Sequence, residues 1–127
     1  MGQALLVNLD LDLGAKILRI LDQADLKVRV ALWVHLEEYT DWRLVFASRR
    51  FDDAGILGGY SLLNRALAAA GFPIETKPAT MILPMTDPTI RGLRRSFGKA
   101  KSVEGMRLGG QQIGNRWVED GYVYRVS

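Results

Sequence analysis

Cysteine is absent from the 127 residues of this chain, and histidine occurs only once. The lack of cysteine excludes disulfides, thiolate metal sites and cysteine nucleophiles, and it agrees with a reducing compartment. No apolar run approaches the roughly 20 residues that are needed to span a bilayer. The first ten residues also lack the basic segment and the long apolar core of a secretory signal. These absences predict a cytoplasmic protein of prokaryotic style that has no membrane partner.

The chain as a whole has little excess of either charge, because its formal net charge is only +3. Its distribution is uneven, however. Residues 1–75 hold eight Lys/Arg against ten Asp/Glu, whereas residues 76–127 hold nine Lys/Arg against four Asp/Glu. The composition, with 48% hydrophobic and 24% charged residues, fits one globular domain over residues 1–127. The basic character is confined to the last two-fifths of that domain.

Hydrophobic periodicity predicts about three helices and a set of strands. One helix is expected over about residues 12–23 with Asp12 as its N-cap, and another over about residues 56–70 with Ile56 on its buried stripe. Asp87-Pro88 predicts the start of a third helix, which ends near residues 98–101. Alternation at period two predicts strands over residues 27–36, 42–47 and 79–83, the second of them central and the third short or at an edge. The order α-β-β-α-β-α-β-β indicates a single α+β domain whose mainly antiparallel sheet carries the helices.

Asp120-Gly121, which lies between two strand-like runs, is a strong local signal for a two-residue β-hairpin turn. Such a turn predicts strands over residues 116–119 and 122–125. In that register Arg116 lies directly opposite Arg125, and two like charges side by side cost free energy unless an acid or an external anion offsets them. The pair therefore hints at an anionic partner.

The expected third helix carries several cations on the arc that its apolar stripe leaves free. No acid follows Asp87 until Glu104, so this surface has one sign. A cluster of this kind is typical of phosphate-backbone contacts, although a solvated helix face has the same composition. The candidate nucleic-acid-binding residues are those of this helix and the cations that the last strands add: Arg91, Arg94, Arg95, Lys99, Lys101, Arg107, Arg116 and Arg125.

Three aromatic residues fall on one face of the expected C-terminal hairpin: Trp117, Tyr122 and Tyr124. Exposed beside arginines, they would form a stacking platform for unpaired bases. Buried, they would be core residues, since aromatic cross-strand pairs commonly stabilise sheets. The sequence leaves both interpretations open.

No residue pattern assigns a catalytic role, a metal or a cofactor. His35 lies close in sequence to Glu37, Glu38 and Asp41, but the repeated ligand spacing of a dedicated metal site is missing. Glu75-Thr76-Lys77 matches only half of a magnesium-dependent nuclease signature, which also needs an upstream aspartate such as Asp41 or Asp52. Glycines 55, 58 and 59 follow no phosphate-binding order.

The sequence therefore favours a small non-enzymatic binding or accessory domain, with nucleic acid as the expected partner. The alternative is a protein-interaction or oligomerisation module whose basic face meets an acidic protein partner, and a homo-oligomer is a further expected form. A magnesium-dependent nuclease is the third hypothesis.

Overall fold

Helices and strands follow one another in the predicted order in a computed structural model, which describes residues 8–127. Residues 1–7, on which the expectation about a secretory signal partly rests, lie outside the described part. None of the helices in residues 8–127 is long and apolar enough to cross a membrane. The elements are α1 Asn8–Gln23, β1 Val30–Leu36, β2 Arg43–Ala47, α2 Arg49–Ala69, a short 3-10 helix Ile74–Thr76, β3 Thr80–Ile82, α3 Pro88–Phe97, β4 Arg107–Ile113 and β5 Arg116–Val126.

The five strands form one sheet in the order β3-β2-β1-β5-β4. Strand β1 is central and pairs antiparallel with β2 and β5, while β5 pairs antiparallel with β4. Only β3 is parallel to its neighbour, and this three-residue strand lies at an edge. The predicted α+β fold with a mainly antiparallel sheet is confirmed. The short edge strand is confirmed as well. The strand predicted to be central, residues 42–47, is β2, which lies inside the sheet but next to the edge strand, while β1 takes the middle position.

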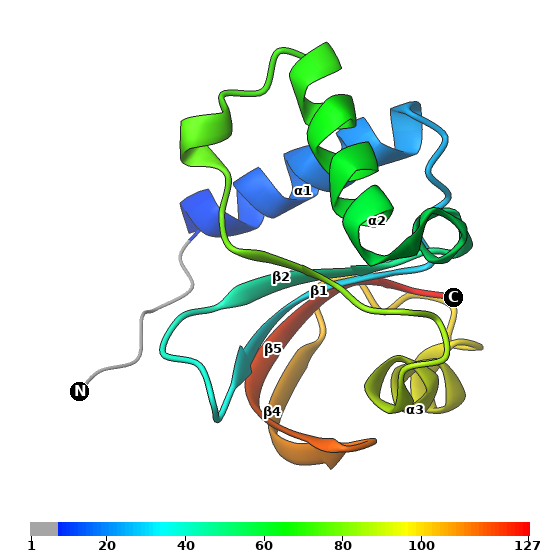
Figure 1. Cartoon of the computed structure of the whole chain (residues 1–127). Helices are drawn as coiled ribbons and strands as arrows, with labels where there is room; N and C mark the ends of the chain where they lie inside the picture. Colours follow the sequence, from blue (N-terminus) through cyan, green and yellow to red (C-terminus); the bar gives the residue numbers. More distant parts are fainter. Residues whose placement is uncertain (1–7) are drawn as a thin grey trace.

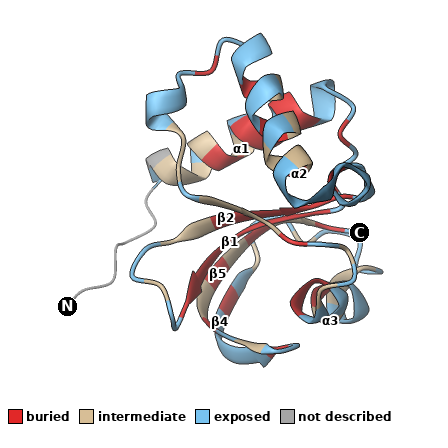
Figure 2. Ribbon diagram, viewed as in Figure 1, coloured by how far each residue is buried: buried red, intermediate tan, exposed pale blue. Residues whose placement is uncertain are grey.

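Helices cover both faces of the sheet. Helices α1 and α2 lie on one face and α3 lies on the other, beside the curled β4 and β5 (Figure 1). Strand β1 is buried along its whole length, as its red colour in Figure 2 shows, and it supplies side chains to both faces of the sheet. Trp33 joins the apolar cluster under α1 and α2, and its neighbour Leu32 joins the cluster under α3. Two cores are therefore built on one central strand.

The predicted turn at Asp120-Gly121 is wrong. Both residues lie inside β5, and the chain reverses at Gly114-Asn115 instead. Gly121 is buried, and a Cβ there would lie 3.1 Å from the carbonyl oxygen of Trp33. The glycine therefore allows β5 to approach its neighbours closely. The Asp-Gly pattern is the same whether the glycine serves such a close approach or the positive φ of a turn, so the local sequence cannot tell the two apart. Gly114 has a φ of 61°, which suits the turn.

The register that paired Arg116 with Arg125 is consequently wrong as well. Arg116 lies opposite Ile113 on β4, and Arg125 lies opposite Ala31 on β1. The two arginines are nine residues apart on a single strand, so no like-charge pair exists between them.

Two helix boundaries also differ from the predictions. Helix α1 begins at Asn8, which places Asp12 inside the helix instead of at its N-cap. Helix α2 begins at Arg49, because the Ser48 hydroxyl caps it by accepting a hydrogen bond from the Arg50 N–H. The helix bends at Gly55, whose φ is 79°. Beyond this bend Ile56 is exposed, so its predicted place on the buried stripe is wrong.

Candidate functional site

Helix α3 has one apolar face and one basic face. The Asp87 carboxylate caps the helix by accepting hydrogen bonds from the N–H groups of Thr89 and Ile90, and Pro88 stands at its first position. Ile90 and Leu93 are buried against the sheet. The remaining arc and the turn after it carry five exposed cations: Arg91, Arg94, Arg95, Lys99 and Lys101. The structure thus places Arg91, Arg94 and Arg95 on α3, as the spacing indicated, whereas Lys99 and Lys101 lie just beyond the end of the helix at Phe97.

Most of these five side chains are not engaged by the protein itself. Within residues 8–127, Arg91, Arg95, Lys99 and Lys101 form no ion pair with a carboxylate and no side-chain hydrogen bond. Arg94 donates a hydrogen bond from Nε to the Ser127 backbone oxygen, at 2.8 Å. The basic face of α3 is therefore open to an external anion.

The β4–β5 turn holds α3 in place. The Thr89 hydroxyl donates a hydrogen bond to the Ile113 carbonyl at 3.0 Å. A Cβ on Gly114 would lie 2.4 Å from the backbone carbonyl of Pro88, so only glycine permits this approach. A Cβ on Gly92 would likewise meet Ile113 at 3.3 Å. These contacts fix the direction in which the basic face points.

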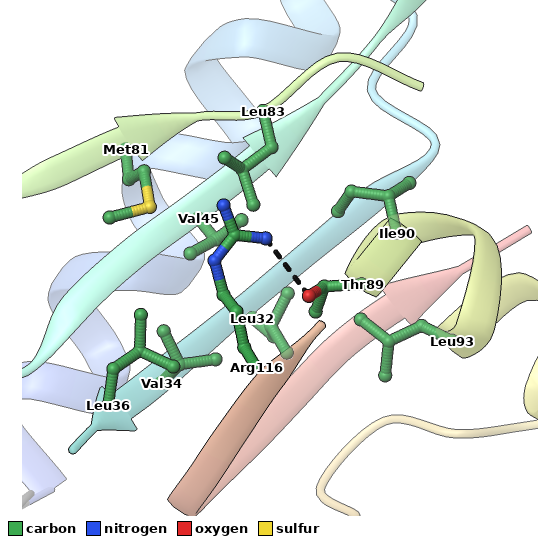
Figure 3. Close-up of a pocket in the computed structure, with 10 residues that line it drawn as sticks. All are labelled: Leu32, Val34, Leu36, Val45, Met81, Leu83, Thr89, Ile90, Leu93 and Arg116. Carbon is green, nitrogen blue, oxygen red and sulfur yellow. Dashed lines mark hydrogen bonds between the residues drawn. The ribbon is translucent and has the colours of Figure 1, made fainter. Parts of the chain in front are cut away.

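Arg116, the first residue of β5, reaches the start of α3, where its Nη1 donates a hydrogen bond to Asp87 at 2.7 Å. The same nitrogen donates to Thr89 at 2.9 Å, the bond that is dashed in Figure 3. Its side chain is only 22% exposed. Next to it, apolar residues from the sheet and α3 line a cavity of about 10 Å³. That volume is about the size of one water molecule, so α3 is closely packed and the cavity is no ligand pocket. Arg116 is an internal tie between strand and helix.

Arg125 and Arg107 are also paired with acids. The Arg125 guanidinium donates two hydrogen bonds to Asp22 at the end of α1, at 2.8 and 2.9 Å, and this contact raises the pKa of Arg125 above its usual value. Arg107 pairs with Asp120 at 2.8 Å. Each of these candidate arginines, like Arg116, is therefore already neutralised by a carboxylate of the protein itself. Asp87, the partner of Arg116, lies at the start of α3, and Asp22, the partner of Arg125, lies near the end of α1 on the other face of the sheet.

The three aromatic residues of β5 separate into two environments. Tyr122 and Tyr124 are partly buried, contact each other edge to face, and pack against the cluster under α1 and α2. Trp117 is 40% exposed beside a shallow polar hollow that Glu37 and Glu38 also line. Because carboxylates repel phosphate, this hollow does not extend the basic surface. The common stacking platform is not formed.

The residues considered for metal or acid–base chemistry do not gather. His35 is buried, its Nε2 lies 3.4 Å from the Thr40 carbonyl oxygen, and its ring contacts Trp42 edge to face. Glu75 lies in the 3-10 helix, and the following Lys77 contacts Asn64. Within the described residues, no three side chains of the metal-binding types come together. No cluster of metal-binding side chains in residues 8–127 therefore supports the nuclease hypothesis that rests on Glu75-Thr76-Lys77.

The fold and this surface define a small α+β protein that presents one short helix with an open basic face. No protein-family model, no curated protein and no solved structure matches the chain.

Proposed function

We propose that this protein binds nucleic acid through the basic face of α3 and the turn that follows it, the surface formed by Arg91, Arg94, Arg95, Lys99 and Lys101. The observation that carries the proposal is that none of these five exposed cations has an ion-pair partner within residues 8–127, and that only Arg94 among them donates a side-chain hydrogen bond. A cytoplasmic, prokaryotic setting belongs to the same proposal.

Phosphate contacts explain why such a face suits a polynucleotide. Each cation that neutralises a phosphate releases a condensed counterion, so several cations on one helix give affinity that needs no base-specific contact. Arginine adds a planar fork of donors that matches two phosphate oxygens. Arg116, Arg125 and Arg107 are left out of the proposed surface because Asp87, Asp22 and Asp120 already neutralise them. We therefore expect binding that depends little on sequence and strongly on salt.

The test replaces Arg91 and Arg95 together by alanine and measures binding to labelled single-stranded and duplex DNA by fluorescence anisotropy. We expect weaker binding, and a plot of log affinity against log salt that is less steep by about 1.8 for duplex, since each lost contact removes about 0.9. Thermal stability should stay nearly unchanged, because both side chains are exposed and unpaired.

A matched control removes the same charge from the other face of the sheet. Arg19 on α1 and Arg65 on α2 are exposed, so the Arg19→Ala/Arg65→Ala variant has the same net charge as the test variant. We expect its salt dependence to stay close to that of the wild type. The proposal fails if the wild type does not bind DNA or RNA at low salt, or if both double variants lose affinity equally.

An interaction module, the alternative function, is favoured by a separate observation. Two adjacent aliphatic side chains on α2, Ile56 and Leu57, are more than four-fifths exposed.

A further inference from the structure

The β1–β2 loop and the β4–β5 hairpin enclose an open hollow of about 460 Å³. Glu37 and Glu38 line it from the loop, and Trp117 lines it from β5. The other lining residues are polar side chains of the hairpin: Gln112, Asn115 and Arg116. We call this depression the Trp117 hollow. It is far larger than the cavity beneath α3 and is large enough for a side chain of another molecule.

Trp117 presents an exposed aromatic ring to this hollow. The residue is 40% exposed, whereas Trp33 is buried. The indole lies beside the β4 backbone at a residue without a side chain, because a Cβ on Gly110 would be 3.8 Å from Trp117 Cζ2. The faces of an indole ring are electron-rich, so they attract cations and stack on flat, delocalised groups. The ring therefore favours a flat or cationic ligand.

Two carboxylates in the Trp117 hollow are not neutralised by the protein. Glu37 and Glu38 are exposed and form no ion pair and no side-chain hydrogen bond within residues 8–127. Arg116, the cation among the lining residues, is already paired with Asp87. The hollow consequently attracts positive charge and repels phosphate, in contrast to the basic face of α3.

The amide side chains of the hollow have free groups that suit a peptide backbone. The Asn115 Oδ1 accepts a hydrogen bond from the Thr89 hydroxyl, which leaves the Asn115 amide nitrogen free to donate. The Gln112 Nε2 donates to the Gly114 carbonyl oxygen, which leaves the Gln112 amide oxygen free to accept. One free donor and one free acceptor match the C=O and N–H groups of a peptide.

Other classes of ligand use only part of this arrangement. A divalent metal ion needs several oxygen ligands, and no three metal-binding side chains come together in the part of the chain that the structure describes. A neutral ligand would leave both carboxylates unpaired, and a polynucleotide would bring phosphates close to them. An organic cation carried by a peptide uses the ring, the carboxylates and the amides together.

We propose that the Trp117 hollow binds an arginine side chain in a basic peptide segment of a partner protein. The guanidinium plane stacks on the indole of Trp117, and its fork of donors bonds to the carboxylate of Glu37 or Glu38. The ammonium group of lysine has no plane and is more strongly hydrated, so it fits less well. This interaction surface is separate from the proposed nucleic-acid surface.

Nuclear magnetic resonance titration of the full chain with a capped glycine peptide that contains two arginines tests the proposal. The indole N–H signal of Trp117 reports on the hollow itself. We titrate to about 2 mM at low salt, because one cation–π contact and exposed ion pairs give a dissociation constant of about 0.1–1 mM. We expect a saturable shift of this signal, and binding about threefold or more weaker for the same peptide with lysines.

Two variants separate the parts of the hollow. Glu37→Gln/Glu38→Gln should bind the arginine peptide about five- to tenfold more weakly. Trp117→Leu, followed through the backbone amides of Glu37 and Glu38, should bind it about three- to fivefold more weakly. Asp53→Asn/Glu75→Gln is the matched control, because it removes two exposed carboxylates outside the hollow and should leave binding unchanged.

Several results would overturn the proposal. These are no saturable shift of the Trp117 signal, equal loss of affinity in the two double variants, and equal affinity for the arginine and lysine peptides. Equal affinity for the free diamine putrescine would assign the hollow to small organic cations instead. The Arg91→Ala/Arg95→Ala variant should bind the peptide as the wild type does, so failure of nucleic-acid binding leaves this proposal intact.

Discussion

The Tyr124 hydroxyl joins helix α1 to the sheet through two hydrogen bonds. It donates to the Leu11 carbonyl oxygen at 2.6 Å and accepts from Trp33 Nε1 at 2.9 Å. A Cβ on Gly14 would lie 2.3 Å from this hydroxyl, so α1 reaches the sheet because residue 14 has no side chain. Burial raises the pKa of Tyr124 to about 12, although the hydrogen bond from Trp33 acts in the opposite direction.

Tyr124→Phe should lower the free energy of unfolding at pH 7 by about 1–3 kcal/mol, because the Trp33 N–H and the Leu11 carbonyl lose their partner. It should also change the response to alkali. The folded pKa of Tyr124, about 12, exceeds the ordinary value of 10, so its contribution to stability is complete below pH 10 and is lost as the pH rises through 12. The variant should lack this loss between pH 10 and 12.

Urea denaturation at pH 7 and pH 11 measures both effects. Tyr39→Phe is a suitable control, because the Tyr39 ring lies beneath the Arg43 guanidinium and its hydroxyl has no hydrogen-bond partner in the described residues. The assignment to Tyr124 is wrong if wild type and Tyr124→Phe lose equal stability between the two pH values.

Helix α3 shows which elements local sequence can predict. Asp87-Pro88 correctly predicted its start, and the spacing of Ile90 and Leu93 correctly predicted its buried face, because both signals act within one or two helical turns. Its three exposed arginines, Arg91, Arg94 and Arg95, followed from the same periodicity. Strand pairing depends on distant residues, so the choice between Asp120-Gly121 and Gly114-Asn115 as the turn could not be made locally.

Local sequence could not predict the ion pairs that remove Arg116 and Arg125 from the candidate site, for the same reason. Arg116 meets Asp87 across 29 positions, and Arg125 meets Asp22 across 103 positions. No periodicity within β5 shows these carboxylates. Ile56 was misplaced because helical spacing identifies an apolar stripe but cannot show where the core beneath it ends.

Gly114→Ala should separate the β4–β5 turn from α3. Gly114 has positive φ, and an added Cβ would lie 2.4 Å from the Pro88 backbone, so either the helix or the turn must move. We expect the free energy of unfolding to fall by about 2–4 kcal/mol, as for strain combined with lost packing. Gly109→Ala on the same hairpin is the control, because nothing lies within 4 Å of its added Cβ.

Amide hydrogen exchange of α3 measures this separation directly. In Gly114→Ala the α3 amides should exchange faster than in the wild type, while those of α1 keep their relative protection. Equal stability of the Gly114→Ala and Gly109→Ala variants would show that the turn does not hold the helix.

The two halves of the sequence differ in charge, and the sheet separates the helices that they supply. Residues 1–75, with more acids than bases, contribute α1 and α2 on one face, whereas the basic residues 76–127 contribute α3 on the other (Figure 1). The exposed pair Ile56 and Leu57 lies on α2, and the proposed nucleic-acid surface lies on α3 and the turn after it. The two surfaces therefore belong to different elements of the fold and can be altered independently.

The whole chain should nevertheless unfold as one unit, because β1 is buried on both faces and belongs to both apolar clusters. Leu63→Ala under α2 and Leu93→Ala under α3 should each lower the free energy of unfolding by about 2–5 kcal/mol. In both variants the helical circular dichroism signal and the tryptophan emission, to which Trp33 contributes, should change at one common denaturant midpoint. If Leu93→Ala shifted the helical signal alone, α3 would unfold before the rest, and the basic surface would be a separable unit.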